Sequence, residues 1–429
     1  MGGHLLVVGM ARSGVSVARL AVAQGFRVVC TDRRLDAPVI DGTESHYGKH
    51  DRDDFVTADR IVVSPGVPAS MPEIQAALSA GVLIEGELPF AASFLKCPIL
   101  AVSGTNGKST TTHLLGQLLA NSGLRTFTGG NIGVPLSDAV AGSQDVCAVE
   151  VSSYQMEFPG KFRPRAAAIL NLTPDHLERH GTLDDYAAHK CRMFARMGPD
   201  DAAILPAGEP RLRRIADVLP GRRYLLGDRP GVRIEGESIV LYDVHDPGPV
   251  GLAGFSLRGR HNRENLAAAV LLAVCGGAMR HNLDVARLSG LPHRVEVIGE
   301  TGGITWVDDS KATNVDSALA AFVGWEGPFH ALVGGRGKSG AAYESLVEPL
   351  RRARSVTCFG EEGPLIYAAL RRGDVMAQLV PRLVDAVAAA RALASAGEAV
   401  ILSPACASFD EFIDFEHRGR VFRALALNC

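Results

Sequence analysis

The sequence lacks the features that mark membrane-spanning, disulfide-rich and nucleic-acid-binding proteins. Its most apolar run, LAAAVLLAVCGGAM at 266–279, is shorter than the roughly 20 residues of a membrane-spanning helix. The formal net charge of −3 provides no general field for attracting nucleic acid or an anionic membrane. The eight cysteines contain no C-x-x-C pair and no zinc-site spacing. We therefore expect a cytoplasmic monomer with reduced thiols, a buried helix at 266–279, and neither membrane nor nucleic-acid partners.

The chain is long enough for several domains. It has 429 residues, of which 47% are hydrophobic and 21% charged, whereas single cores stop growing at about 250–300 residues. Short β-branched runs alternate with Ala/Leu-rich helical patterns, as is typical of parallel sheets flanked by helices. We predict an α/β protein with three domains: a Rossmann-like N-terminal domain at 1–92, a P-loop ATPase-like central domain at 93–290, and a Rossmann-like C-terminal domain at 291–429.

The strongest motif is VSGTNGKSTTTHLLGQLL, in which an apolar strand runs through a glycine-rich turn into a helix. Gly104 and Gly107 allow the turn to point N–H groups inward, and the helix N-terminus favours an anion. Lys108 can reach the β- and γ-phosphates, and Ser109 or Thr110 can offer a hydroxyl to Mg²⁺. The loop is shorter than the usual G-x-x-x-x-G-K-[ST] motif, and an ordinary glycine turn is the alternative. The pattern predicts an ATP site.

Further polar residues follow the next strands of the central block. Glu150 ends the strand in AVEVSSYQME, and Asp175 with His176 follows the strand before NLTPDHLERHG. Ligands bind at the carboxyl edge of open α/β sheets, so Glu150 is a candidate Mg²⁺ ligand. In the alternative interpretation, Asp175 and His176 are loop residues with no catalytic or binding role. Lys190, within a predicted helix, reads from sequence alone as a solvated charge.

The outer blocks carry weaker patterns. The charged cluster Asp308–Lys311 follows the strand ITWV, and Gly334–Lys338 follows HALV, where glycines permit close approach to an anion. Exposed surface loops are the alternative for both segments. Near the N-terminus, GMARSG is similar to a dinucleotide fingerprint with Ala11 in place of the second glycine. This pattern favours a phosphate or uridine site over an NAD site.

The motifs together resemble those of a known family, the Mur ligases of peptidoglycan synthesis. The similarity runs in order along the whole chain through GTNGKSTTT, GNIG, EVSSYQ, NLTPDHLERHG with Lys190, GRHNREN, LPHRVE, DDSKATN, GGRGKSG and SPACASFDEFIDFEHRG. Within the family, DSKATN plus SPACASFDEF is similar to the member that adds D-glutamate to UDP-N-acetylmuramoyl-L-alanine. The resemblance implies an ATP-dependent amide ligase that acts through an acyl phosphate with two Mg²⁺ ions. L-glutamate or another amino acid remains an alternative acceptor.

The resemblance also implies roles for individual residues. The catalytic set would be Lys108, Glu150, His176, Lys190, Asn131 and Lys311. Metal binding would fall to Ser109, Glu150, His176 and Lys190, the last as a carbamate. ATP would be bound by Gly104, Thr105, Asn106, Gly107, Lys108, Ser109, Thr110, Asn262, Asn265, Arg294 and Asp309. The UDP substrate would be bound in the first domain and its neighbourhood by Arg12, Ser13, Asp32, Arg33, Ser64, Gly66, Asn131, Ser153 and Gln155. Glutamate would be bound in the C-terminal domain by Thr313, Lys338, Ser408 and Phe415.

Four other functions compete with this interpretation. A folylpolyglutamate synthetase-like ligase shares the phosphate loop, but the Rossmann-like first block argues against it. A non-catalytic muropeptide or nucleotide sensor would not need Lys108, Glu150, His176 and Lys190 together. A phosphotransferase would release a phosphorylated substrate instead of free phosphate. A dehydrogenase would need an intact G-x-G-x-x-G, which is missing.

Overall fold

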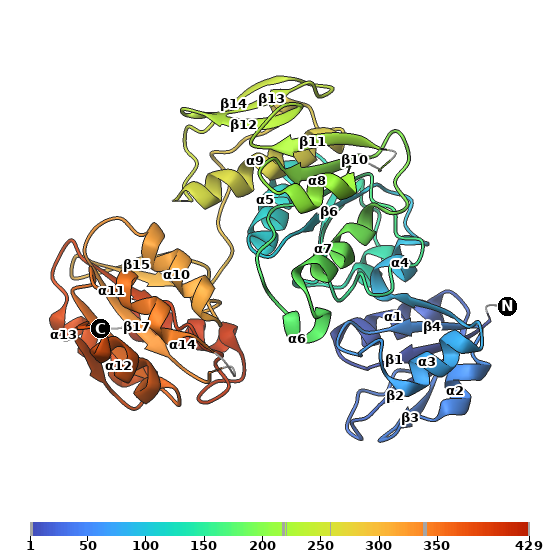
Figure 1. Ribbon diagram of the computed structural model, residues 1–429, viewed down its shortest axis with the longest axis horizontal. Helices are drawn as coiled ribbons and strands as arrows, with labels where there is room; N and C mark the ends of the chain where they lie inside the picture. The colour runs from blue at the N-terminus through green and yellow to red at the C-terminus, as the bar shows by residue number, and fades with distance from the viewer. Residues whose placement is uncertain (1–2, 217–218, 220, 258, 338–340, 428–429) are drawn as a thin grey trace. The chain divides into compact units, whose positions relative to one another are not determined.

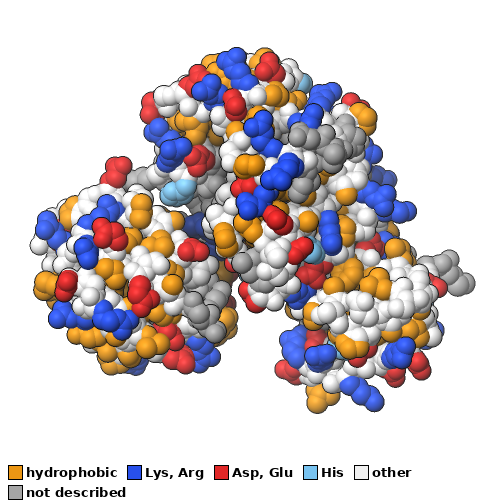
Figure 2. Space-filling model, in the orientation of Figure 1, with side chains coloured by type: hydrophobic (Ala, Val, Ile, Leu, Met, Phe, Trp, Pro, Cys, Tyr) orange, Lys and Arg blue, Asp and Glu red, His pale blue; other side chains and the backbone are white. Residues whose placement is uncertain are grey.

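The computed structural model describes residues 3–216, 219, 221–257, 259–337 and 341–427 (Figure 1). Contacts between Cα atoms divide the chain into two compact units, which are described separately. The first comprises 1–256 and 261–289, and the second comprises 257–260 and 290–429. The three domain boundaries expected from the sequence remain predictions. Figure 2 shows basic and acidic side chains interspersed on the visible face, in keeping with the small net charge.

The first sheet of the larger unit is parallel throughout, and its described strands follow the order β3-β2-β1-β4-β5. This is the strand order of a Rossmann-like half-sheet. The strands are β1 (His4–Val8), β2 (Arg27–Asp32), β3 (Thr43–Tyr47), β4 (Arg60–Val63) and β5 (Leu83–Gly86). The helices are α1 (Arg12–Ala23), α2 (Arg52–Thr57), α3 (Pro72–Ser79) and α4 (Glu87–Ala92). The strand HLLVV is apolar because both faces of β1 are covered, as parallel sheets require.

The second sheet of this unit has the order β14-β13-β12-β11-β10-β9-β6-β8-β7 within the described residues. Its strands are β6 (Ile99–Ser103), β7 (Thr126–Gly130), β8 (Val146–Glu150), β9 (Ala166–Ile169), β10 (Ala202–Pro206), β11 (Arg222–Leu226), β12 (Gly231–Glu235), β13 (Ser238–Tyr242) and β14 (Gly248–Gly251). Its helices are α5 (Lys108–Asn121), α6 (Leu177–His180), α7 (Leu183–Cys191), α8 (Pro210–Ala216) and α9 (Arg260–Cys275), with 3-10 helices η1 (Leu136–Ala141), η2 (Arg192–Phe194) and η3 (Arg280–Asn282).

The far edge of this second sheet differs from the parallel pattern. Strand β13 pairs antiparallel with β12 on one side and with β14 on the other (Figure 1). Gly236, with φ +58°, turns the chain between the first two of these strands. Alternating half-buried residues, such as those of SIVLY in β13, suit an antiparallel sheet with one covered face.

The smaller unit contains one sheet with the described order β15-β16-β20-β17-β18-β19. All its pairs are parallel except β15 with β16. The strands are β15 (Glu296–Thr301), β16 (Ile304–Asp308), β17 (Phe329–Gly334), β18 (Ser355–Phe359), β19 (Ala377–Leu379) and β20 (Ala399–Leu402). The helices are α10 (Val315–Gly324), α11 (Val347–Leu350), α12 (Gly363–Arg372), α13 (Leu383–Leu393) and α14 (Phe415–Leu427), with the 3-10 helix η4 (Tyr343–Leu346).

The apolar run at 266–279 belongs largely to α9, as expected. Residues Leu266–Val274 are all buried. Because every side of this part of the helix is covered, its residues are apolar on all sides. Across the described residues, no helix combines the length and the apolar character that crossing a membrane requires.

Candidate active site

The phosphate-loop motif forms the turn between β6 and α5. Gly104 has φ +143° and Gly107 has φ +82°, both in the region that favours glycine. A Cβ on Gly107 would lie 2.3 Å from Asn265 Oδ1, so glycine lets the start of α9 approach the loop. Helix α5 begins at Lys108, and the amides of its first turn lack intrahelical acceptors. The loop therefore has the local geometry of an anion site.

Asn171, two residues after β9, holds this loop in shape. Its Oδ1 accepts hydrogen bonds from the backbone N–H groups of Thr105 and Asn106 at 3.1 and 2.8 Å. Its Nδ2 donates to Asn106 O at 3.0 Å. The Thr105 hydroxyl also donates to Thr173 O at 3.1 Å and accepts from Thr173 N at 3.0 Å. The segment after β9 thus fixes the course of the loop after β6.

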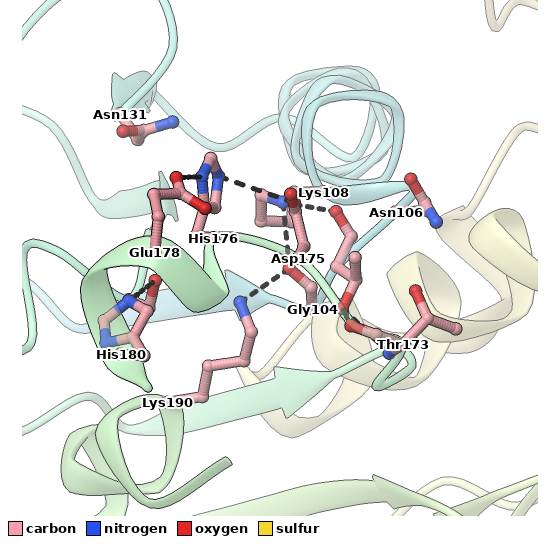
Figure 3. Close-up of polar contacts among 12 residues, drawn as sticks. Gly104, Asn106, Lys108, Asn131, Thr173, Asp175, His176, Glu178, His180 and Lys190 are labelled. Carbon is pink, nitrogen blue, oxygen red and sulfur yellow. Dashed lines mark hydrogen bonds and ion pairs between the residues drawn. The ribbon is translucent and has the colours of Figure 1, made fainter. Parts of the chain in front are cut away.

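Lys190 lies beside the loop, and its side chain is buried rather than solvated. Its Nζ donates to Gly104 O at 2.8 Å (Figure 3). The same Nζ lies 4.3 Å from the centroid of the Tyr186 ring. Lys108 Nζ donates to the same carbonyl at 2.8 Å. Burial, followed by repulsion from Lys108, lowers the pKa of Lys190 to about 7. A large fraction of this amine is therefore neutral, and nucleophilic, near neutral pH.

Glu150 provides a buried carboxylate at the end of β8. Strand pairing places Gly130 of β7 opposite Glu150, so Asn131 follows directly at the sheet edge. The Asn131 Nδ2 donates to Glu150 Oε1 at 2.7 Å. The other oxygen, Oε2, is buried and accepts no hydrogen bond from the described residues. Leaving a buried carboxylate oxygen unsatisfied is unfavourable, so this atom is suited to a ligand such as a metal ion.

His176 lies just before α6, between the carboxylates of Asp175 and Glu178 (Figure 3). Its backbone has φ +54°, and its Nε2 is 3.4 Å from Asp175 Oδ2. The His176 ring is 5.0 Å from the ring of Tyr154, on which His180 stacks at 5.4 Å. The His180 Nε2 is 2.9 Å from Ser153 Oγ. The structure therefore links His176 and Ser153 through Tyr154 and His180.

The residues predicted for UDP binding in the first domain lie at the carboxyl ends of β1, β2 and β4. Asp32 Oδ2 accepts from Met10 N at 2.7 Å, and Asp32 Oδ1 accepts from Arg34 N at 2.8 Å. Burial alone would raise the pKa of Asp32, but the hydrogen bonds from Arg34 and Met10 hold it below its ordinary value. Arg33 and Arg34 are both exposed, and Arg34 is the one that pairs with Asp32, its Nη2 lying 3.2 Å from Asp32 Oδ2.

Other members of this set lie close to the first turn. Ser64 Oγ donates to Gly9 O at 2.6 Å, and a Cβ on Gly14 would lie 1.9 Å from the same oxygen. The glycines of GMARSG thus allow α1 to begin against the end of β1. Arg12 Nη1 donates to Gly133 O at 2.8 Å, which connects this turn to the loop that follows β7. Ser13 is half-buried and Gly66 exposed in the same region.

In the smaller unit, Asp309, Lys311 and Thr313 follow the end of β16, and Ser408 follows β20. Asp309 accepts from Ser403 Oγ at 2.6 Å and from Val295 N at 3.2 Å, and burial raises its pKa to about 7. Lys311 Nζ is 5.4 Å from the centroid of the Phe415 ring. Ser408 is buried, Thr313 is half-buried, and the buried Nε of Arg294 has no hydrogen-bond partner among the described residues. Lys338 lies outside the described residues.

Comparisons with known proteins match this arrangement along the chain. The Mur ligase MurD-like N-terminal domain matches residues 3–86, the Mur ligase middle domain matches 102–273, and the Mur ligase glutamate ligase domain matches 293–406. A UDP-N-acetylmuramoylalanine--D-glutamate ligase of Anaeromyxobacter dehalogenans is 44% identical over 99% of this chain and 97% of its own length. The ligase of that name from Pelotomaculum thermopropionicum is 37% identical with the same coverage. The chain belongs to the Mur ligase family.

The fold of this Mur ligase agrees with that of solved family members. The MurF ligase from Thermotoga maritima in complex with ADP has a TM-score of 0.61 and 16% identity, covering 99% of this chain and 95% of its own. The α/β fold with three Mur ligase domains and the membership of the family, both expected from the sequence, are thereby confirmed.

The structure brings several predicted residues of this Mur ligase together and adds others. Lys108 and Lys190 meet at Gly104, and Asn131 meets Glu150. In α9, Asn265 Nδ2 is 3.5 Å from Asn262 Oδ1, close to the phosphate loop. Buried Gln155 accepts from Ser152 N at 2.9 Å through its side chain. Sequence reasoning missed Asn171, Arg34 and His180. The position of Asn171, two residues after a strand, was the available signal.

Proposed function

We propose that this Mur ligase joins D-glutamate to UDP-N-acetylmuramoyl-L-alanine in an ATP-dependent reaction of peptidoglycan precursor synthesis. Relatives named for that activity support the proposal, since they match nearly the whole chain at 44% and 37% identity. All three domain families occur in order, and the C-terminal match is a glutamate ligase domain. We further propose boundaries of 1–92, 93–290 and 291–429 for domains that bind the UDP substrate, ATP and glutamate.

The observation that carries the proposal is the arrangement around Gly104. The phosphate loop, the buried Glu150 and the buried Lys190 adjoin the carboxyl ends of β6, β8 and β9. A protein that only senses nucleotide would need neither a buried lysine of lowered pKa at the phosphate loop nor a buried carboxylate oxygen without a hydrogen bond among the described residues. Perturbed ionisable groups of this kind are typical of catalytic sites.

The reaction follows from the chemistry of a carboxylate, which is a poor acyl donor. An oxygen of the alanyl carboxylate attacks the γ-phosphorus of ATP, the bond to the bridging oxygen breaks, and ADP leaves. The glutamate amine then attacks the carbonyl carbon of the acyl phosphate, loses a proton, and displaces inorganic phosphate. The protein contributes mainly position and charge. Lys108 and the amides of the Gly104–Thr110 loop would hold the phosphates, while Asn131 and Lys311 would contact the acyl phosphate.

Mg²⁺ fits the residues present. Glu150 Oε2 has no hydrogen bond within the described chain, and the Ser109 hydroxyl lies in the first turn of α5. These oxygens would hold one ion, and His176 with Lys190 would hold a second. Lys190 would do so as a carbamate, formed when its neutral amine attacks CO₂ and loses a proton. Bound Mg²⁺ would neutralise phosphate charge.

Substrate contacts complete the proposal. ATP would also be contacted by Asn262, Asn265, Arg294 and Asp309. The UDP substrate would be contacted by Arg12, Ser13, Asp32, Arg33, Ser64, Gly66, Asn131, Ser153 and Gln155. Glutamate would be contacted by Thr313, Lys338, Ser408 and Phe415. Arg34 joins the second set because it, and not Arg33, pairs with Asp32.

The test is incubation of the protein with ATP, Mg²⁺ and UDP-N-acetylmuramoyl-L-alanine, adding D-glutamate or L-glutamate in separate reactions. We expect phosphate release that depends on both substrates, and a product mass equal to the sum of the two substrates minus water. Reactions without acceptor or without nucleotide are the controls. Absence of phosphate release with either enantiomer would remove the ligase proposal, and product with L-glutamate alone would correct its stereochemistry.

A further inference from the structure

Arg418 is a fully buried arginine in the first turn of α14 that has no place in the reaction proposed above. Its Nε donates to Ser310 Oγ at 2.9 Å, and its Nη2 donates to Ser310 O at 2.8 Å. The same Nη2 donates to Cys406 O at 3.0 Å, and Nη1 donates to Ala407 O at 3.2 Å. One guanidinium therefore joins the loop after β16 to the loop after β20.

A third loop packs against the same group. A Cβ on Gly335, which follows β17, would lie 2.9 Å from Arg418 Nη1 and 2.3 Å from Ala407 O. Arg336 N also donates to Ala407 O at 2.9 Å, and Ala407 N donates to Arg336 O at 2.9 Å. Strands β16, β20 and β17 are neighbours in the sheet. Arg418 thus lies where the three successive loops at this edge converge.

The start of α14 contacts the first of these loops at two more points. Ser310 Oγ donates to Phe415 O at 2.8 Å, and Lys311 lies against the Phe415 ring. A Cβ on Gly419 would lie 2.1 Å from Nδ1 of His293, whose carbonyl accepts from Lys311 N at 3.0 Å. The helix therefore fits closely against the segment that presents Lys311.

The hydrogen-bond partners of Arg418 indicate a structural purpose for its charge. The four bonds go to three carbonyls and one hydroxyl, and none goes to a carboxylate. Burial lowers the pKa of Arg418 to about 10, while Asp410 and other nearby carboxylates favour the charged form. A planar group with five donors can bond several carbonyls at fixed angles, which a lysine cannot do.

We propose that Arg418 is a positioning residue that sets the spacing of the loops after β16, β17 and β20, and so aligns Lys311, which would contact the acyl phosphate, with Ser408, which would contact the incoming glutamate. This inference rests on the proposed function, because that function gives these loops their substrate. Ser408 follows Ala407 directly, and Lys311 follows Ser310 directly. A shift of either carbonyl therefore moves a residue proposed to contact the substrate.

The experiment compares Arg418→Lys and Arg418→Ala with wild type and with Arg391→Lys. Arg391 is a matched control because it donates to Leu425 O and Ala426 O, at the other end of α14. We expect Arg418→Lys to raise the KM for glutamate by about tenfold or more, with the Kd for the UDP substrate within about twofold of wild type. Guanidinium ion should restore part of the activity of Arg418→Ala. Hydrogen exchange should quicken at 309–313 and 405–408.

The outcomes separate the two proposals. If wild type forms no product, the ligase function fails, and hydrogen exchange in the Arg418 variants decides the positioning role by itself. If wild type is active but Arg418→Lys keeps its KM for glutamate, or raises the KM for every substrate equally, the positioning role is wrong. An equal effect of Arg391→Lys would also overturn it, as would unchanged exchange in both loops.

Discussion

Replacing Asn171 by alanine should weaken ATP binding without unfolding the protein. The change removes three hydrogen bonds between the Asn171 side chain and the backbone of Thr105 and Asn106. Each such bond contributes a net amount of about 0.5–1.5 kcal/mol, and the site is partly exposed, so the loop loses about 1–3 kcal/mol of its preference for the bound shape. If nucleotide binding must restore that shape, the Kd for ATP rises about 5- to 150-fold.

The assay is isothermal titration with ATP and Mg²⁺, performed on Asn171→Ala, Asn171→Asp and wild type. The aspartate variant keeps the two accepted hydrogen bonds but places a negative charge beside the loop, so it should bind ATP more weakly than its thermal stability suggests. Asn282→Ala is the control, because Asn282 is exposed in η3, and should leave the Kd unchanged. A Kd for Asn171→Ala within twofold of wild type would show that the loop keeps its shape without this residue.

Three further changes test the ionisable groups. The pKa of Lys190 is lowered from 10.5 to about 7 in the folded protein, so the unfolded state binds more protons between these two pH values. The unfolding free energy of wild type should therefore rise with pH, by up to about 1.4 kcal/mol per pH unit relative to Lys190→Met. Urea denaturation from pH 7.5 to 9.5 measures this difference. The pKa of Asp309 is raised from 3.8 to about 7 in the folded protein, so its contribution to the unfolding free energy is present at low pH and is lost between pH 4 and 7. Asp309→Asn should remove this pH-dependent loss of unfolding free energy. Parallel curves of unfolding free energy against pH for wild type and Asp309→Asn would contradict the prediction. Glu150→Gln keeps an acceptor for Asn131 but loses the negative charge, so half-maximal activity should need more Mg²⁺ with little change in melting temperature; an unchanged Mg²⁺ dependence would exclude Glu150 as a ligand.

Local sequence signals were sufficient for the parallel strands and helices around the phosphate loop. The order strand, glycine turn, helix at 99–121 is determined by residues close together in the chain, and Gly104 and Gly107 have the positive φ values that such a turn requires. The hairpin at 231–242 was not anticipated, because the short alternating runs on either side of Gly236 give a weak signal within a sequence dominated by parallel patterns.

The site was only partly predictable for a physical reason. Burial of Lys190 depends on how α7 packs near Gly104, and the two residues are separated by 86 positions. The helical periodicity around Lys190 does not depend on that packing, so the sequence pattern predicted a solvated charge. Only the family resemblance predicted that Lys190 belongs to the site. Asn171 and Arg418 were missed for the same reason, since their partners are backbone groups of distant loops.

The bond between Asn106 and Asn171 spans 65 positions of sequence and forms only where β9 lies beside β6. Closing so long a segment carries an entropic cost that neighbouring residues cannot offset alone. On a ribosome, a growing chain that has produced the glycine turn but not yet β9 would lack the restraint that shapes it. The loop therefore cannot be fully shaped for nucleotide before Asn171 has been synthesised, and a chain truncated before that residue should bind ATP more weakly than the full chain.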